Sequence, residues 1–325
     1  MSDEKKDRND ANEKEEEEDA WQVVSSKRSA RGVKHRQNIQ NAKTAFRFGE
    51  DDDDDDDKDD DDETKDESKF EALVEDTTRK LERAKRDVQS SSFFQTRVLN
   101  AFREDDLLRE RANSCTKMVV LGTGSFRHSA TSRYQMMLAI LLSEDEELTK
   151  EMKKVCVYDP AFGKVDVEVL KRMKVVREGV SVEAWSAERS KRFVENSEEE
   201  KNENVFAYMP HCEADLYEEI LEHRWEVGSS ENESDDPMGR MLLCGNKFSN
   251  YYERWSFANN SRLTTKTKRK PNRVVALGNQ ENECIEKEIS LEGETKESKF
   301  SLHNGTFNDT AVHVFKNGFV RPFKV

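Results

Sequence analysis

The sequence predicts an α/β fold of the Rossmann-like, three-layer type, with a mostly parallel sheet and a disordered, charged amino-terminal tail. Short apolar runs rich in Val and Leu alternate with segments that have the spacing of amphipathic helices. Strands that are apolar along their whole length are typical of a parallel sheet with both faces covered. Glycine and polar residues follow these runs directly, at the strand ends where such folds bind ligands.

Net charge is unevenly distributed along the chain. It is −15 over 325 residues, and residues 1–70 carry 14 Lys and Arg against 25 Asp and Glu, a net of −11. The rest of the chain is therefore close to neutral, which argues against a strongly basic nucleic-acid-binding core. Residues 1–69 show no sustained hydrophobic period and include EDDDDDDDKDDDDE at 50–63, so we expect a disordered tail.

Charged segments are the expected contact sites for protein partners. Residues 21–49 hold seven Lys or Arg and no acid, beginning at Trp21, and a second basic cluster precedes Pro271. Each basic stretch is either a docking or nuclear-import signal or a solvated tether, and the Asp run is either a spacer or a site for a basic partner. We expect neither membrane nor nucleic acid as a partner.

The cysteines and the hydropathy of the chain indicate the cellular compartment. The five cysteines are scattered and form no C-x-x-C pair, which is typical of a reduced intracellular protein. No signal peptide is recognised, and MMLAILL at 136–142 is too short to cross a bilayer. We expect a protein of the cytoplasm, the nucleus or both.

The elements follow in the order that this fold requires. A helical lead-in is predicted over 70–112 from apolar residues near helical spacing: Phe70, Leu73, Leu81, Val88, Val98 and Phe102. The α/β domain is expected at 113–258, with strands at 117–122, 154–158, 174–176, 204–209 and 240–245. Helices are expected at 132–142, 165–173, 182–194 and 214–225. An acidic loop is expected at 229–239, followed by an extension over 259–325 with an ordered motif at 307–315.

Four strand ends carry the candidate ligand-binding residues. Because the carboxyl ends of parallel strands lie at one edge of a sheet, these residues should converge there. They are Gly122, Gly124, Ser125, Asp159, His211, Gly245 and Asn246, together with Ser132 and Arg133 in the helix after the first strand.

The loop GTGS at 122–125 is the strongest single motif. Its glycines permit a tight turn, and backbone N–H groups at the following helix start would face an anion. However, Arg127 replaces the third glycine of G-x-G-x-x-G, and no acid ends a strand about 20 residues later, so a standard NAD site is not expected. Two alternatives stay open: a cradle for a phosphate-bearing or nucleotide-like ligand, and a purely structural turn.

Catalytic and metal sites are weakly indicated. Asp159 could bind a ribose or act as a base, but before Pro160 it also suits an Asx turn. His211 and Cys212 could form a nucleophile pair, yet adjacent residues on an extended loop tend to point apart. The His and Cys residues show no recognised metal-ligand spacing, so no catalytic residue is assigned.

Seven short motifs together resemble the sensitivity-to-red-light-reduced family. They are GTGSF at 122–126, SRYQ at 132–135, YDPAF at 158–162, YMPHC at 208–212, DLY at 215–217, GNKF at 245–248 and FNDTAVHVF at 307–315. The resemblance covers about 118–253 and the last motif, and the Trp21 segment is similar to the start of the family pattern. Lys247 stands where that pattern has Ser, which questions any hydroxyl role there.

The resemblance implies a regulatory protein of circadian clock input and red-light signalling in plants, and cytoskeletal or haem-related regulation in fungal and animal members. It implies no reaction. The competing hypothesis is an enzyme that uses a nucleotide or S-adenosylmethionine-like cofactor at the loop 122–125. A third hypothesis, a nucleic-acid-associated factor, rests only on the two basic stretches.

Overall fold

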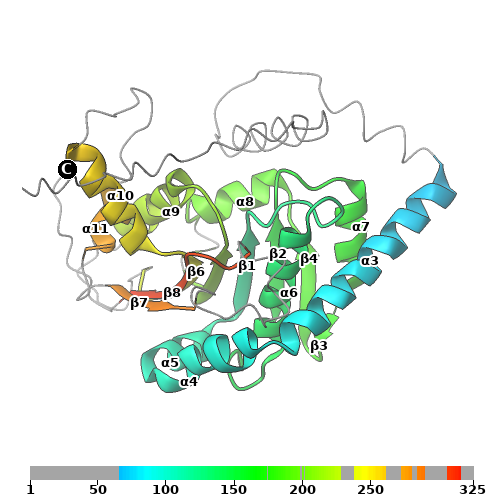
Figure 1. The fold of residues 1–325 in the computed structure, drawn as a ribbon, viewed down its shortest axis with the longest axis horizontal. Helices are drawn as coiled ribbons and strands as arrows, with labels where there is room; N and C mark the ends of the chain where they lie inside the picture. The colour runs from blue at the N-terminus through cyan, green and yellow to red at the C-terminus, as the bar shows by residue number, and fades with distance from the viewer. Residues whose placement is uncertain are drawn as a thin grey trace, which may run out of the picture. The chain divides into compact units, whose positions relative to one another are not determined.

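The computed structural model describes residues 66–173, 175–197, 200, 202–227, 238–260, 272–279, 284–289 and 306–315. All of them belong to one compact unit, Ala42–Val325. The predicted α/β fold is confirmed, with a mixed sheet (Figure 1). The expected tail at 1–69, apart from its last four residues, and most of the acidic loop at 229–239 lie outside the described residues.

The described strands form one eight-stranded sheet in the order β3-β4-β2-β1-β5-β6-β8-β7. The five strands β4, β2, β1, β5 and β6 run parallel to one another, whereas β3, β8 and β7 pair antiparallel with their neighbours. The strands are β1 Lys117–Leu121, β2 Lys154–Tyr158, β3 Val175–Arg177, β4 Val180–Ala184, β5 Val205–Met209, β6 Met241–Asn246, β7 Cys284–Glu288 and β8 Thr310–Phe315.

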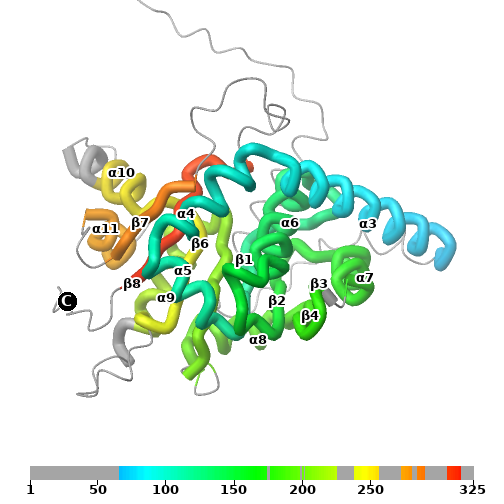
Figure 2. Tube along the Cα trace, turned by 90° about the horizontal axis from the view of Figure 1, so that it is seen from below, coloured from blue at the N-terminus to red at the C-terminus, as the bar shows by residue number. Residues whose placement is uncertain are grey.

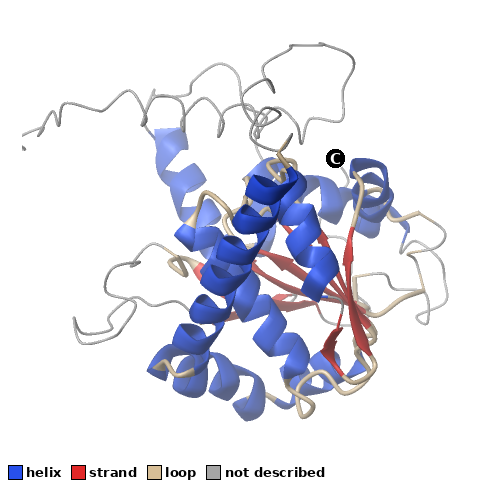
Figure 3. Cartoon of the chain, turned by 90° about the vertical axis from the view of Figure 1, so that its right-hand side faces the viewer, coloured by secondary structure: helices blue, strands red, loops and turns tan. Residues whose placement is uncertain are grey.

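Helices pack on both faces of the sheet (Figure 3). Side chains of a strand alternate between faces, and β1 places Met118 and Val120 in one core cluster and Val119 and Leu121 in the other. Helices of the first cluster are α3 Glu67–Gln89, α4 Leu99–Glu104, α5 Asp106–Ser114, α6 Ala130–Glu144 and α7 Lys164–Met173, with the π-helix η2 Phe93–Val98. Those of the second are α8 Ala187–Val194, α9 Ala214–Val227, α10 Phe248–Asn260 and α11 Asn272–Leu277.

The predicted helical lead-in is several helices rather than one. Asp66 caps α3, and Asp105 interrupts the stretch and caps α5 with its side chain, which accepts from the Leu108 N–H at 3.1 Å. Helix α3 runs along α6 and α7 (Figure 2), and its Leu81 and Val88 are buried. Its apolar stripe is therefore packing surface.

One predicted element is wrong. Residues 182–194 were expected to be a helix, but β4 occupies their first part and α8 only their second. Gly179, at φ +80°, lies in the tight turn that returns the chain from β3 to β4. The pairing of β4 with β2 decides the strand, and alternation over only three positions was too short a signal to reveal it.

The carboxyl-terminal motif completes the sheet. Strand β8 lies between β6 and β7, and all six of its residues are buried. Most of the motif at 307–315 forms this strand, whereas β7 was not foreseen, because Glu and Lys occupy three of its five positions. No helix among the described residues is both long enough and apolar enough to cross a membrane.

Candidate functional site

Sequence-distant candidate residues meet at the carboxyl ends of β1, β2, β5 and β6. The Gly124 N–H donates to Asp159 Oδ2 at 2.7 Å, which joins the tips of β1 and β2. The Cys212 thiol lies 3.5 Å from the Leu121 carbonyl oxygen, which joins β5 to β1. The His211 N–H donates to Asn246 Oδ1 at 3.0 Å, which joins β5 to β6. Adjacent tips are thus connected by direct contacts.

Both glycines of the β1 loop have a backbone that other residues rarely adopt. Gly122 has φ +73° and Gly124 φ +76°. A Cβ atom on Gly122 would lie 2.4 Å from Cys212 Sγ, and one on Gly124 would lie 2.8 Å from Ser132 Oγ. Conformation and space therefore both require glycine here, whether or not the loop binds a ligand.

Carboxylates of the protein accept the hydrogen bonds that this loop could offer to an anion. Asp166 accepts from Ser125 Oγ at 2.8 Å, from the Phe126 N–H at 2.9 Å and from the Arg127 N–H at 3.1 Å. It also accepts from the Gly163 N–H at 3.0 Å, in front of its own helix α7. With Gly124 bonded to Asp159, the N–H groups of Gly124, Phe126 and Arg127 and the Ser125 hydroxyl are engaged within the chain.

The two α6 candidates support the loop. Ser132 is buried, and its N–H donates to Ser129 Oγ at 3.2 Å in the amino-terminal cap of α6. Arg133 Nη1 donates to the Phe126 carbonyl oxygen at 2.6 Å. Burial lowers the pKa of the Arg133 guanidinium. Arg133 thus holds the loop carbonyl rather than extending toward a ligand.

Asp159 forms the turn that its position before Pro160 predicts. Its Oδ1 accepts from the Ala161 N–H at 2.8 Å, two residues on, which is an Asx turn. Burial raises the pKa of Asp159, and the N–H groups of Ala161 and Gly124 offset part of that rise. Its two oxygens fix the loops after β1 and β2.

His211 and Cys212 do not face each other. His211 Nε2 lies 2.8 Å from the Thr306 carbonyl oxygen, and because a carbonyl only accepts, this nitrogen carries the proton. The Cys212 thiol is buried against β1, and burial raises its pKa well above the usual range. A thiol held protonated and away from the imidazole is a poor nucleophile.

The β6 tip is organised by two tyrosines that were not predicted. The Tyr217 hydroxyl donates to the Met209 carbonyl oxygen and accepts from the Asn246 N–H at 2.9 Å. Asn246 Nδ2 donates to Tyr251 Oη at 2.8 Å and to the Cys212 carbonyl oxygen at 3.0 Å. Gly245 is required because its Cβ would lie 2.3 Å from Tyr217 Oη.

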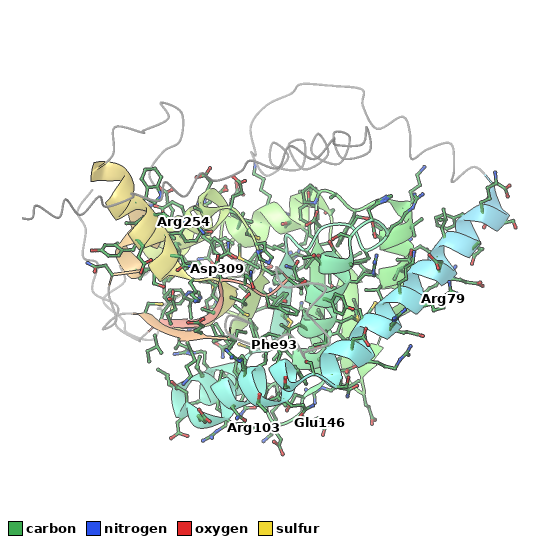
Figure 4. All side chains as sticks on the ribbon, viewed as in Figure 1. Arg79, Phe93, Arg103, Glu146, Arg254 and Asp309 are labelled. Carbon is green, nitrogen blue, oxygen red and sulfur yellow. The ribbon has the colours of Figure 1, made fainter. Side chains whose placement is uncertain are left out.

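An open pocket of about 160 Å³ lies beside this tip. Asp309 Oδ1 accepts from Asn250 Nδ2 at 2.7 Å, and its Oδ2 lies 3.6 Å from Arg254 Nη2 (Figure 4). Lys247 Nζ pairs with Glu288 at 2.7 Å. The lining residues are His211, Asn246, Lys247, Asn250, Tyr251, Arg254 and Asp309.

The family model of the SRR1 domain matches the sequence of this chain over residues 78–314, from within α3 to within β8. That span is most of the chain. The chain belongs to the SRR1 domain family. The expected resemblance is thereby confirmed, and the matched span includes every candidate residue named above.

Two relatives of the SRR1 domain illustrate the range of similarity. Protein SENSITIVITY TO RED LIGHT REDUCED 1 of Arabidopsis thaliana is 24% identical over 244 residues, which are 74% of this chain and 74% of that protein. The SRR1-like protein of Mus musculus is 33% identical over 141 residues, 43% of this chain and 48% of that protein, so the match spans about half of it. No solved structure matches the chain.

Sequence reasoning missed the central carboxylate of this SRR1 domain. Asp166 is the third residue of α7 and resembles an ordinary acid in the first turn of a helix. The available signal was its position three residues after Gly163, which suits a side chain that turns back to the helix start. Its bonds to a loop 40 residues earlier required the fold.

Chemically, the edge is well suited to holding loops together. No group of three or more His, Cys, Asp or Glu among the described residues could hold a metal ion. Gly124, Asp159, His211 and Asn246 lie on connected strand tips, but none is paired as a base with a nucleophile. The pocket at β6 offers hydrogen-bond donors and acceptors to a small polar molecule.

Proposed function

We propose that the protein is a regulatory factor of light and circadian-clock signalling, built on a Rossmann-like platform that carries out no reaction of its own. The name of the Arabidopsis relative ties that protein to red-light sensitivity. Membership of the same domain family supports a signalling role here. The charged tails would contact protein partners in the cytoplasm, the nucleus or both.

The non-catalytic part of this proposal rests on the hydrogen bonds that the strand tips make within the chain. Asp166 and Asp159 accept the loop N–H groups, and the Cys212 thiol is buried and protonated. An enzyme site of this fold would present such groups to a substrate. Here the same groups join loops of the chain to one another, which suits a platform whose surface is recognised by protein partners.

A small-ligand site at the β6 tip forms the second part of the proposal. Lys247 and Arg254 place two cations on the pocket wall beside the Asp309 carboxylate, and Asn250 and Tyr251 add polar groups. Two cations and several neutral donors beside one carboxylate suit a small anion, phosphate-bearing ligands included. The pocket would let such a ligand adjust a signalling surface without chemistry.

The regulatory role can be tested in plants that lack the Arabidopsis relative. We expect expression of this chain to restore red-light responses, measured by seedling growth under red light and by the period of a clock-driven reporter. A Gly124→Val chain, in which the added side chain would clash with Ser132 of α6, should accumulate poorly and fail to restore them. Normal accumulation of the parent chain without any restoration would contradict the role.

The enzyme alternative is tested by ligand-dependent stability. Nucleotides, S-adenosylmethionine and inorganic phosphate are added to the intact protein, because a ligand that binds only the native state raises its melting temperature. We expect that no rise is abolished by Ser125→Ala, which removes the loop hydroxyl and keeps both glycines. Because phosphate also suits the β6 pocket, Arg254→Ala serves as the control for that pocket. A nucleotide-dependent rise that Ser125→Ala abolishes and Arg254→Ala leaves unchanged would support the enzyme.

A further inference from the structure

The direction in which strands are added to the sheet reverses between β1 and β5. From β1 the chain adds β2 and β4 on one side, then returns to add β5 and β6 on the other. In open α/β sheets, ligands bind outside the carboxyl ends of the strands at this reversal. The region above β1 and β5 is thus the first place to look for an occupant.

The occupant is the chain itself, in the four residues that precede β8. The Thr306 carbonyl oxygen accepts from Gln135 Nε2 of α6 at 3.0 Å and from His211 Nε2 at the β5 tip at 2.8 Å. One carbonyl therefore joins the helix that follows β1 to the end of β5. These contacts span the reversal point.

An aromatic anchor holds the same segment on the α6 side. The Phe307 ring is fully buried and stacks on the Phe93 ring of η2, with centroids 4.8 Å apart. This segment, which leads into the red strand of Figure 2, thus reaches the first turn of the π-helix. Phe93, labelled in Figure 4, lies far along the sequence from its partner.

A change of backbone direction marks where the segment leaves the sheet. Asp309 has φ +59°, a left-handed conformation, directly before the first residue of β8. Its carbonyl oxygen accepts from the Lys247 N–H at 2.7 Å, and its side chain lines the β6 pocket. A pivot at Asp309 would move the preceding residues without breaking the β8 ladder.

Two buried hydroxyls indicate that the closed arrangement is incompletely satisfied. Thr123 in the β1 loop and Thr306 in the segment are both buried, and neither Oγ1 has a hydrogen-bond partner among the described residues. Buried polar groups without partners are rare and lower stability. Neither hydroxyl therefore adds a hydrogen bond that would hold the segment in place.

We infer that residues 306–309 form a strap over the carboxyl ends of β1 and β5, pivoting at Asp309 and held by Phe307 and the Thr306 carbonyl. Because Asp309 also lines the β6 pocket, opening of the strap would change that pocket. That this change controls ligand binding rests on the proposed function. The opening itself requires no ligand to be observed.

Thiol labelling at position 135 measures that opening. A Gln135→Cys thiol lies beside the strap and removes one of the two donors to the Thr306 carbonyl, so every protein compared carries it. Native Cys156 in β2 reports global unfolding because it is fully buried. We expect alkylation at position 135 to be at least ten times faster than at Cys156, and to stay constant in low urea while Cys156 accelerates. Sites are assigned by mass spectrometry. Equal rates with equal urea dependence would overturn the strap.

Variants distinguish a strap from general destabilisation. Phe307→Ala should accelerate labelling at position 135 at least tenfold more than at Cys156, whereas Phe102→Ala, another fully buried ring, should accelerate both alike. His211→Asn tolerates the left-handed backbone at φ +55° and removes one hold on Thr306, so it serves if Phe307→Ala does not fold. If neither variant selectively accelerates labelling at position 135, the inference is contradicted, whatever the ligand-dependent melting temperatures show.

Discussion

At the residue scale, the two glycines of the β1 loop illustrate how a motif can be structural. A phosphate cradle and a tight internal junction both require a left-handed backbone and a close approach. In this protein the close approach is made by Cys212 and Ser132, and the N–H groups meet Asp159 and Asp166. The motif GTGSF is therefore explained by the residues that surround it.

Gly122→Ala should destabilise the protein by about 3 kcal/mol, from a left-handed alanine and overpacking against Cys212. Gly179→Ala is the matched control, because its φ is similar but a Cβ there would meet nothing within 4 Å. It should cost about 1 kcal/mol. Urea unfolding measures both. Adding Cys212→Ala should recover part of the stability lost in Gly122→Ala. If the losses of the two single variants simply add in the double variant, the contact between position 122 and Cys212 is contradicted.

Asp166→Ala should lower the free energy of unfolding by about 3 kcal/mol, because four donors around a buried carboxylate lose their acceptor. Glu168→Ala is the control on the same helix. Among the described residues, Glu168 pairs only with surface Lys171 and Arg172, so its loss should cost at most about 1 kcal/mol. Similar losses for both variants in urea unfolding would show that Asp166 does not hold the loop.

At the element scale, helix starts are stabilised by carboxylates from other segments. Glu286 of β7 accepts from the N–H groups of Phe248 and Ser249 at the start of α10. Glu218 of α9 accepts from the N–H groups of Arg273 and Val274 at the start of α11. Donors at a helix start otherwise lack partners, so these bonds fix α10 to the edge strand β7 and α11 to helix α9.

The Glu286 contact should make stability depend on pH. Burial alone would raise the pKa of Glu286, but bonds to His313 and Ser249 lower it to about 2 from 4.5. The depressed pKa means that the stabilisation is present above about pH 4.5 and is lost as pH falls toward 2. We expect a loss of about 3 kcal/mol across that window, reduced in Glu286→Gln. Equal acid sensitivity in urea titrations of both proteins would refute it.

Elements with long, regular patterns could be predicted from the sequence, and those defined by pairing could not. The β2 bounds agree at both ends, because KVCVY is apolar and bounded by polar residues. The last three residues of β4 were predicted as helix, because their strand conformation is decided by pairing with β2. Strand β7 is too polar to be recognised as a strand from its sequence. At the site, strand-tip residues were foreseen from topology, but Asp166 and Asp309 were not.

At the scale of the whole molecule, the carboxyl-terminal strand is part of the core. Strand β8 separates β6 from β7, and Val312 and Val314 belong to the same cluster as α3 and α6. The family match likewise extends from α3 to β8. Segments more than 200 residues apart thus form one cooperative unit.

Removing residues 304–325 should abolish cooperative unfolding, since β6 and β7 would both lose their partner. Removing residues 1–65 should leave the free energy of unfolding within about 0.5 kcal/mol, because the described core begins at α3. Circular dichroism during urea titration measures both shortened chains. A cooperative transition without residues 304–325 would show that β8 is dispensable.

The central claim is that the loop after β1 is held by the protein's own carboxylates rather than by a ligand. Residue-resolved hydrogen exchange on the intact, ligand-free protein tests it most directly. We predict slow exchange at the amides of Gly124, Phe126 and Arg127, with Phe126 and Arg127 losing protection in Asp166→Ala. Fast exchange at these amides in the free protein, slowed only when a nucleotide or phosphate is added, would contradict the account.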